Sequence, residues 1–137
     1  MQVAPEIIKD IAGTLDIGLK VFIDLGSHEI IEIPDEDEID YMDGELWRES
    51  IDKVRFNPKN YKEIKGMSSR DSYEVMQDFI ETVNSKRLQD KLLQAIEGRK
   101  PFANFSFQID NSGEFRELWF AFKNQKMIEW VTDQLGD

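Results

Sequence analysis

One short stretch decides how the second half of this chain folds: Gly98-Arg99-Lys100-Pro101-Phe102-Ala103-Asn104-Phe105. Glycine commonly ends a helix, and proline is favoured in the first turn of the next one. The stretch therefore predicts a corner between two helices, with Arg99 and Lys100 at the turn. Cations at this place also neutralise the negative end of the first helix dipole, which is worth about 0.3–1 kcal/mol.

Hydrophobic spacing around the corner predicts a mainly helical C-terminal part. Apolar residues recur every three or four positions over residues 69–83, 86–97 and 114–135. Ser68-Ser69-Arg70-Asp71 indicates the start of the first of these helices, because a serine oxygen there can accept a hydrogen bond from the free backbone N–H groups. Pro101 starts a further helix, which continues to Ile109 on one apolar face.

The N-terminal part predicts a helix and a small antiparallel sheet. Apolar spacing indicates a helix over residues 4–16, and branched and aromatic residues indicate strands over 20–25 and 29–33. Residues 26–28 have turn chemistry, so the two strands form a hairpin. A helix is expected over residues 45–56, and residues 61–65 are compatible with a third strand. The fold class is therefore α+β, in one domain of residues 1–137.

Composition excludes several classes of protein. With 40% hydrophobic and 33% charged residues, the chain has the balance of a soluble globular protein. It contains no cysteine, which excludes disulfides and cysteine metal sites. The first residues lack the pattern of a signal peptide, and the apolar runs fall far short of the roughly 20 residues that cross a bilayer. We therefore expect a cytoplasmic protein.

The net charge of −11 is unevenly spread. Residues 1–57 hold five basic and fifteen acidic residues, a net charge of −10, whereas residues 58–137 hold twelve and thirteen, a net charge of −1. Within the first part, residues 34–45 carry seven carboxylates. This charge repels phosphate backbones and anionic lipids, which disfavours nucleic-acid and membrane partners. The natural complement is another protein with a basic surface.

No pattern predicts a metal, a cofactor or a reaction. In the acidic run, Ile39 stands where a calcium loop needs its third oxygen ligand, and no glycine follows it. His28 is the single histidine and lies in the expected hairpin turn, so we interpret it as an ordinary surface residue. No glycine-rich phosphate loop occurs. A small hydrolase that uses paired carboxylates remains an alternative without positive support.

The candidate binding residues gather around the corner and the last helix. They are Arg99, Lys100, Arg116, Trp119 and Phe120. Aromatic residues at helical spacing usually form the core. Trp119, Phe120 and Phe122, however, cannot all lie on one side of a helix, so at least one is expected to face solvent, a groove or a partner. Self-association through such a surface is a further expectation.

A more specific interpretation of the corner is a helix-turn-helix that binds DNA. Its second helix, residues 102–109, contains no basic residue, whereas recognition helices carry side chains that reach bases and phosphates. Stacking of single-stranded RNA on exposed rings is a variant of the same idea. A nucleic-acid-associated regulator that uses Gly98–Phe102 therefore stays an alternative, and nucleic acid is disfavoured as a partner.

Several blocks of sequence resemble a known family. They are residues 69–79, residues 86–105 with the Gly-Arg-x-Pro-Phe corner, residues 116–122, the Glu129-Trp130 helix, and the segments 22–25 and 31–34. Together they are similar to a bacterial family of uncharacterised proteins, number 0158 of the UPF series. The resemblance implies a mixed α/β fold and a bacterial cytoplasmic origin, and it implies no reaction. Family members usually carry more basic residues after the corner, where this chain has Ala103, Asn104 and Ser106.

The sequence as a whole favours a non-catalytic module that binds another macromolecule, most readily a protein. The corner with Arg99, Lys100 and Arg116 is the expected contact. The helices beyond Ser69 are expected to form the scaffold, with most of their rings turned inward.

Overall fold

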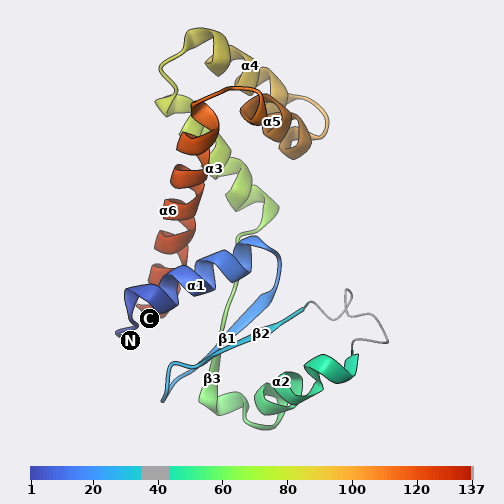
Figure 1. Cartoon of the computed structure of the whole chain (residues 1–137), viewed down its shortest axis with the longest axis vertical. Helices are drawn as coiled ribbons and strands as arrows, with labels where there is room; N and C mark the ends of the chain where they lie inside the picture. The colour runs from blue at the N-terminus through green and yellow to red at the C-terminus, as the bar shows by residue number, and fades with distance from the viewer. Residues whose placement is uncertain (35–43, 137) are drawn as a thin grey trace. The chain divides into compact units, whose positions relative to one another are not determined.

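The computed structural model describes residues 1–34 and 44–136 and consists of helices and one small sheet (Figure 1). The chain forms two compact units. Residues 1–66 and 127–137 form the first, which we call the sheet unit, and residues 67–126 form the second, the helical unit. Most of the expected acidic loop, residues 35–43, lies outside the described residues. The single domain of residues 1–137 stays a prediction.

The sheet unit contains the predicted hairpin and the third strand. β1 (Lys20–Asp24) lies between β2 (Ile30–Ile33) and β3 (Tyr61–Ile64), and both pairings are antiparallel. In the register, Val21 pairs with Glu32 and Ile64, and Phe22 pairs with Ile31. The expectation of a small antiparallel sheet is confirmed.

Helices cover the sheet on both sides (Figure 1). α1 (Pro5–Asp16) contacts β1 and β2 and buries Ile11 and Leu15, while its Thr14 hydroxyl donates to Glu32 Oε1 at 2.8 Å. α2 (Gly44–Phe56) contacts β2 and is followed by the short 3-10 turn η2 (Pro58–Asn60). The C-terminal turns of α6 (Phe115–Leu135) add buried apolar side chains to this unit, namely Met127, Val131 and Leu135.

The helical unit consists of three helices and the N-terminal part of α6. The three are α3 (Ser69–Thr82), α4 (Lys86–Glu97) and α5 (Pro101–Asp110). Ser68 and Asp71 begin α3 with a reciprocal capping box, in which Asp71 N donates to Ser68 Oγ at 3.1 Å and Ser68 N donates to Asp71 Oδ2 at 3.2 Å. The helical C-terminal part was predicted correctly.

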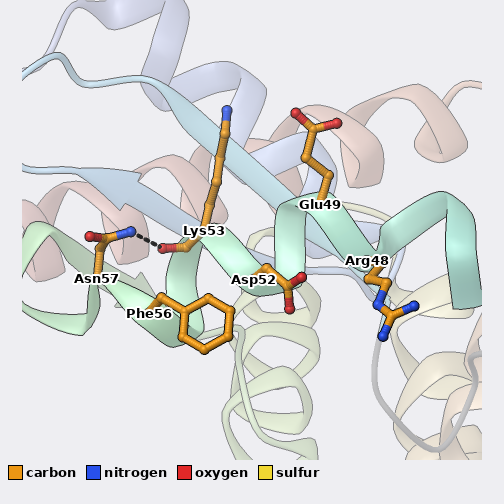
Figure 2. Close-up of a pocket in the computed structure, with 6 residues that line it drawn as sticks. All are labelled: Arg48, Glu49, Asp52, Lys53, Phe56 and Asn57. Carbon is orange, nitrogen blue, oxygen red and sulfur yellow. Dashed lines mark hydrogen bonds between the residues drawn. The ribbon is translucent and has the colours of Figure 1, made fainter.

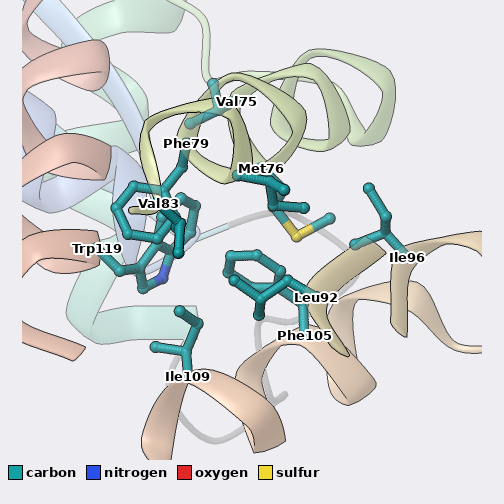
Figure 3. Packing of buried hydrophobic residues seen from close by; sticks show 10 residues of the cluster. Val75, Met76, Phe79, Val83, Leu92, Ile96, Phe105, Ile109 and Trp119 are labelled. Atoms are coloured by element: carbon teal, nitrogen blue, oxygen red, sulfur yellow. The ribbon is translucent and has the colours of Figure 1, made fainter. Parts of the chain in front are cut away.

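A cluster of buried aromatic and aliphatic side chains holds the helical unit together (Figure 3). Phe79 and Phe105 both contact Trp119 edge to face. The ring centroids of Phe79 and Trp119 are 5.2 Å apart, and those of Phe105 and Trp119 are 4.7 Å apart. The remaining buried members come from α3, the residue after it, α4 and α5; they are Val75, Met76, Ile80, Val83, Leu92, Ile96 and Ile109. The rings and branched chains in the middle of the unit therefore form its core, as expected.

Two aromatic residues of α5 do not join this core. Phe102 was expected to continue the buried face of Phe105 and Ile109, but its side chain is 41% exposed. It lies in the first turn of α5, at the corner, where fewer neighbours surround it. Phe107 is 64% exposed because it follows Phe105 by two residues and so faces away from it around the helix.

Among the described residues, no helix combines the length and the apolar character that crossing a membrane requires.

Candidate binding surface

The corner between α4 and α5 has the conformation that the sequence predicted, with one unusual backbone angle. Lys100 caps the N-terminus of α5 in the left-handed region, at φ 52° and ψ 56°. The side-chain amide of Asn104 donates to the Arg99 carbonyl oxygen at 2.7 Å, and Asn104 N donates to Lys100 O at 3.0 Å. The turn is thus held by backbone acceptors, and both cationic side chains project into solvent.

Arg99 and Lys100 have no ion-pair partner among the described residues. Phe102, whose ring is exposed, follows them in the chain after Pro101. We call Arg99, Lys100 and Phe102 the basic corner. Cations that are not neutralised within the protein, beside an accessible ring, are suited to contact an acidic partner surface.

Arg116 does not belong to the basic corner, contrary to our expectation. It lies in the first turn of α6, after the far end of α5, and the ten residues of α5 separate that end from the corner by about 15 Å. Its Nε lies 3.3 Å from Asp110 Oδ1 and its Nη1 3.7 Å from Glu117 Oε1. These carboxylates partly neutralise Arg116, so it serves the junction between α5 and α6.

Trp119 and Phe120, the two aromatic candidates, have opposite surroundings. Trp119 is 7% exposed and belongs to the buried cluster, which removes it from any contact surface. Phe120 is 37% exposed, with Arg116 Cζ 4.7 Å and Lys123 Nζ 5.5 Å from its ring centroid. One ring of this helix therefore does face outward, as the spacing required, and two cations of the same helix flank it.

The outer face of α4 and α5 carries a feature that our sequence analysis missed. Two depressions lie along it and share Lys91. Their polar lining comes from Arg87, Lys91 and Gln94 on α4, from Asn104, Gln108 and Asn111 on or just after α5, and from Ser85 and Ser112 next to these helices. The exposed ring of Phe107 lies among them, and we call the two depressions together the outer groove.

A pattern in the sequence could have revealed the outer groove. Positions 87, 91 and 94, and likewise 104, 108 and 111, are spaced i, i+4 and i+7, so each trio lines one face of its helix. Side-chain amides in such a row are common on exposed helix faces, so the pattern by itself does not indicate a binding surface. The pairing of the two rows depends on the tight turn at residues 98–100, which brings the helices side by side.

A third depression lies on the sheet unit and is less suited to chemistry. It is shallow and is lined by α2 and the residue after it, including Glu49, Asp52 and Lys53 (Figure 2). Lys53 Nζ lies 4.0 Å from Glu29 Oε1, and the Lys53 carbonyl oxygen accepts from Asn57 Nδ2 at 3.1 Å. The depression is thus the surface of a single helix, with two cations and two carboxylates that do not converge on a point.

The hairpin turn contains His28 and an acidic residue with an altered pKa. Asp24 Oδ1 accepts from the backbone N–H groups of Ser27 at 2.9 Å and Gly26 at 2.7 Å, which lowers the pKa of the Asp24 carboxyl below its ordinary value. His28 N donates to Asp24 O at 2.8 Å, and His28 has φ 64°. These contacts build a turn. Across residues 1–34 and 44–136, no three acidic or histidine side chains are grouped so that they could hold a metal ion.

Comparisons with known proteins agree with the resemblance seen in the sequence. The chain matches the model of the Uncharacterised protein family (UPF0158) over residues 3–137. It is 28% identical over 131 residues to UPF0158 protein PA5073 of Pseudomonas aeruginosa, an alignment that covers 95% of this chain and 80% of the relative. No solved structure matches it. The chain belongs to the uncharacterised protein family UPF0158.

Proposed function

We propose that this protein is a non-catalytic binding module that holds another protein through its basic corner. The observation that carries the proposal is the pair of exposed cations, Arg99 and Lys100, without an ion-pair partner in the described part of the chain. They precede the exposed residue Phe102 by three and two positions in the chain, at the junction of helices that a dense core holds in place. A rigid scaffold with a small charged and aromatic contact suits binding.

The distribution of charge supports a partner with an acidic contact surface at this corner. The helical unit has nine basic and nine acidic residues and is neutral, whereas the sheet unit has eight and nineteen, a net charge of −11. Within the helical unit, residues 86–109 hold five basic and two acidic residues, a net charge of +3. A basic protein surface stays the proposed complement of the acidic run at residues 34–45, which is a separate contact.

The proposal places the protein in the cytoplasm of a bacterium. The relative from Pseudomonas aeruginosa and the absence of cysteine support that location. For the hydrolase alternative, a depression on α2 contains Glu49 and Asp52, but it is shallow and lacks converging carboxylates. It gives that alternative no support.

Capture of partners from a bacterial lysate, with identification by mass spectrometry, tests the proposal. We expect the double variant Arg99→Ala/Lys100→Ala to lose a protein partner that the unaltered chain retains. The matched control is Arg55→Ala/Lys59→Ala, which removes two exposed cations from the sheet unit and should leave that partner bound. A partner kept equally by both variants contradicts the proposal. If the captured material is instead nucleic acid, released steeply as salt rises, the regulator alternative replaces it.

A further inference from the structure

We propose that the outer groove between α4 and α5 binds a short acidic peptide segment that carries one bulky apolar side chain. This inference rests on the proposed function and names the chemistry of the partner. It concerns a surface next to the basic corner, and the two can fail separately.

The lining of the outer groove lacks carboxylates. The chain contains 28 Asp and Glu among its 137 residues, yet none of the described residues that line either depression is acidic. Arg87 and Lys91 are the charged members, and neither has an ion-pair partner among the described residues. An acidic ligand in the groove would therefore meet attraction without like-charge repulsion from its walls.

The side-chain amides suit a peptide backbone. Gln94 on α4 and Gln108 on α5 line the same depression and have no hydrogen-bond partner among the described residues, so each offers two donors and one acceptor oxygen. Asn104 and Asn111 use their Nδ2 atoms on the carbonyl oxygens of Arg99 and Phe107, which leaves their Oδ1 atoms as acceptors. Peptide N–H and C=O groups match such a mixture of donors and acceptors.

Phe107 supplies the apolar contact. Its ring is 64% exposed and lies in the same depression as Gln94 and Gln108. Covering an exposed ring is favourable by about 25 cal/mol for each Å² of apolar surface that the ligand removes from water. A bulky apolar side chain in the peptide would cover this ring, while its neighbouring carboxylates contact Lys91 and Arg87.

The length and charge of the groove favour a short peptide over a polynucleotide. α5 has ten residues and is about 15 Å long, which corresponds to four or five residues of extended chain. Affinity for nucleic acid comes mainly from neutralising many phosphates. The α4–α5 segment has a net charge of +3 in a chain of −11, which is too little for a long polyanion.

Binding of defined probes to the whole protein tests this inference. The probe is a fluorescein-labelled pool of pentapeptides with two acidic residues on each side of a central Leu, Ile, Phe, Met or Trp. Its binding is measured by fluorescence polarisation. A second pool has Lys at the acidic positions, and a third probe is a single-stranded oligonucleotide of ten nucleotides. We expect saturable binding of the acidic pool at least ten-fold tighter than of the basic pool.

Two groove variants and one control locate the binding. Lys91→Glu should weaken the acidic pool at least ten-fold and Phe107→Ala about five-fold, whereas Arg70→Glu, an exposed cation on α3, should change it less than two-fold. In two-dimensional NMR spectra, the side-chain NH₂ signals of Gln94 and Gln108 should shift on addition of the acidic pool. Equal effects of Lys91→Glu and Arg70→Glu, absence of saturable binding, or tighter binding of the oligonucleotide each overturn the inference.

The lysate capture separates this inference from the proposed function. If Lys91→Glu keeps the protein partner that Arg99→Ala/Lys100→Ala loses, the groove inference fails and the basic corner stands. If both variants keep the partner, the proposed function fails as well. Loss of the partner in both variants, together with binding of the acidic pool, supports the two proposals together.

Discussion

Phe105 and Trp119 meet edge to face in the core of the helical unit, with ring centroids 4.7 Å apart. Phe102, three residues before Phe105, is 41% exposed at the basic corner. The same type of side chain therefore has two roles within one turn of α5. The two rings differ in how many neighbours surround them. Removal of a fully buried ring loses its contacts and leaves a cavity, so it costs more stability than removal of an exposed ring.

Truncation of these rings should separate core from surface. We expect Trp119→Ala and Phe105→Ala to lower the free energy of unfolding by about 3–5 kcal/mol each. Phe102→Ala should cost no more than about 1 kcal/mol, because much of its ring already contacts water. Urea denaturation followed by circular dichroism measures all three. A loss above about 3 kcal/mol for Phe102→Ala would contradict its placement at the surface.

Asp24 gives the stability of the sheet unit a dependence on pH. Backbone N–H groups of Ser27 and Gly26 stabilise its ionised carboxylate and lower its pKa in the folded state. The contribution to stability is therefore present above the pKa of the unfolded chain, about 3.9, and is lost as pH falls through the folded value. Asp24→Asn should be less stable than the unaltered chain at pH 7, and the difference should narrow as pH falls below about 3.9. Thermal melts over a series of pH values check this, and a difference that does not change with pH would refute it.

At the scale of elements, the α4–α5 corner keeps a lysine where the backbone favours glycine. Lys100 has φ 52°, a left-handed conformation that costs a residue with a Cβ atom roughly 1 kcal/mol or more. The residue contributes its charge to the basic corner in spite of this cost. If the basic corner has the proposed binding role, stability and binding place opposite demands on position 100.

Two substitutions at position 100 separate charge from conformation. Lys100→Gly and Lys100→Ala both remove the cation, but glycine adopts the left-handed region without a steric penalty. We expect Lys100→Gly to be more stable than Lys100→Ala by about 1 kcal/mol, measured by chemical denaturation. Both variants should weaken binding of the captured protein partner to the same degree. Equal stability of the two would mean that the corner relaxes out of the left-handed conformation.

Most elements could be predicted because their signals are local. The apolar spacing of residues 69–83, the serines at 68 and 69 and the Gly98–Pro101 pair each indicate a helix or its end from neighbouring residues alone. The site was harder to predict because it depends on which residues meet in space. Arg116 was expected at the same contact as Lys100, yet the length of α5 separates the two residues. The outer groove likewise forms only when α4 and α5 pack side by side, which no local signal shows.

At the scale of the whole molecule, the net charge is divided more sharply between the two compact units than between residues 1–57 and 58–137. The sheet unit carries the entire net charge of −11 and the helical unit carries none. Like charges within one compact unit repel each other, and salt screens this repulsion over about 10 Å at 0.1 M ionic strength. The sheet unit should therefore gain stability when an exposed carboxylate is neutralised that, unlike Asp24, accepts no stabilising backbone hydrogen bonds, and the helical unit should not.

Two aspartates offer a closely matched test of this difference. Asp10 on α1 and Asp78 on α3 are both exposed, and each has Glu four residues before it and Thr four residues after it. The residue types at these two helical spacings are thus the same in the two sites. We expect Asp10→Asn to raise the free energy of unfolding by roughly 0.5 kcal/mol more than Asp78→Asn at 0.1 M salt, the scale of exposed charge interactions. The gap should close at 1 M NaCl, because the screening length falls to about 3 Å. A gap that persists at high salt would assign the effect to local packing around Asp10 and would leave the division of charge without a role in stability.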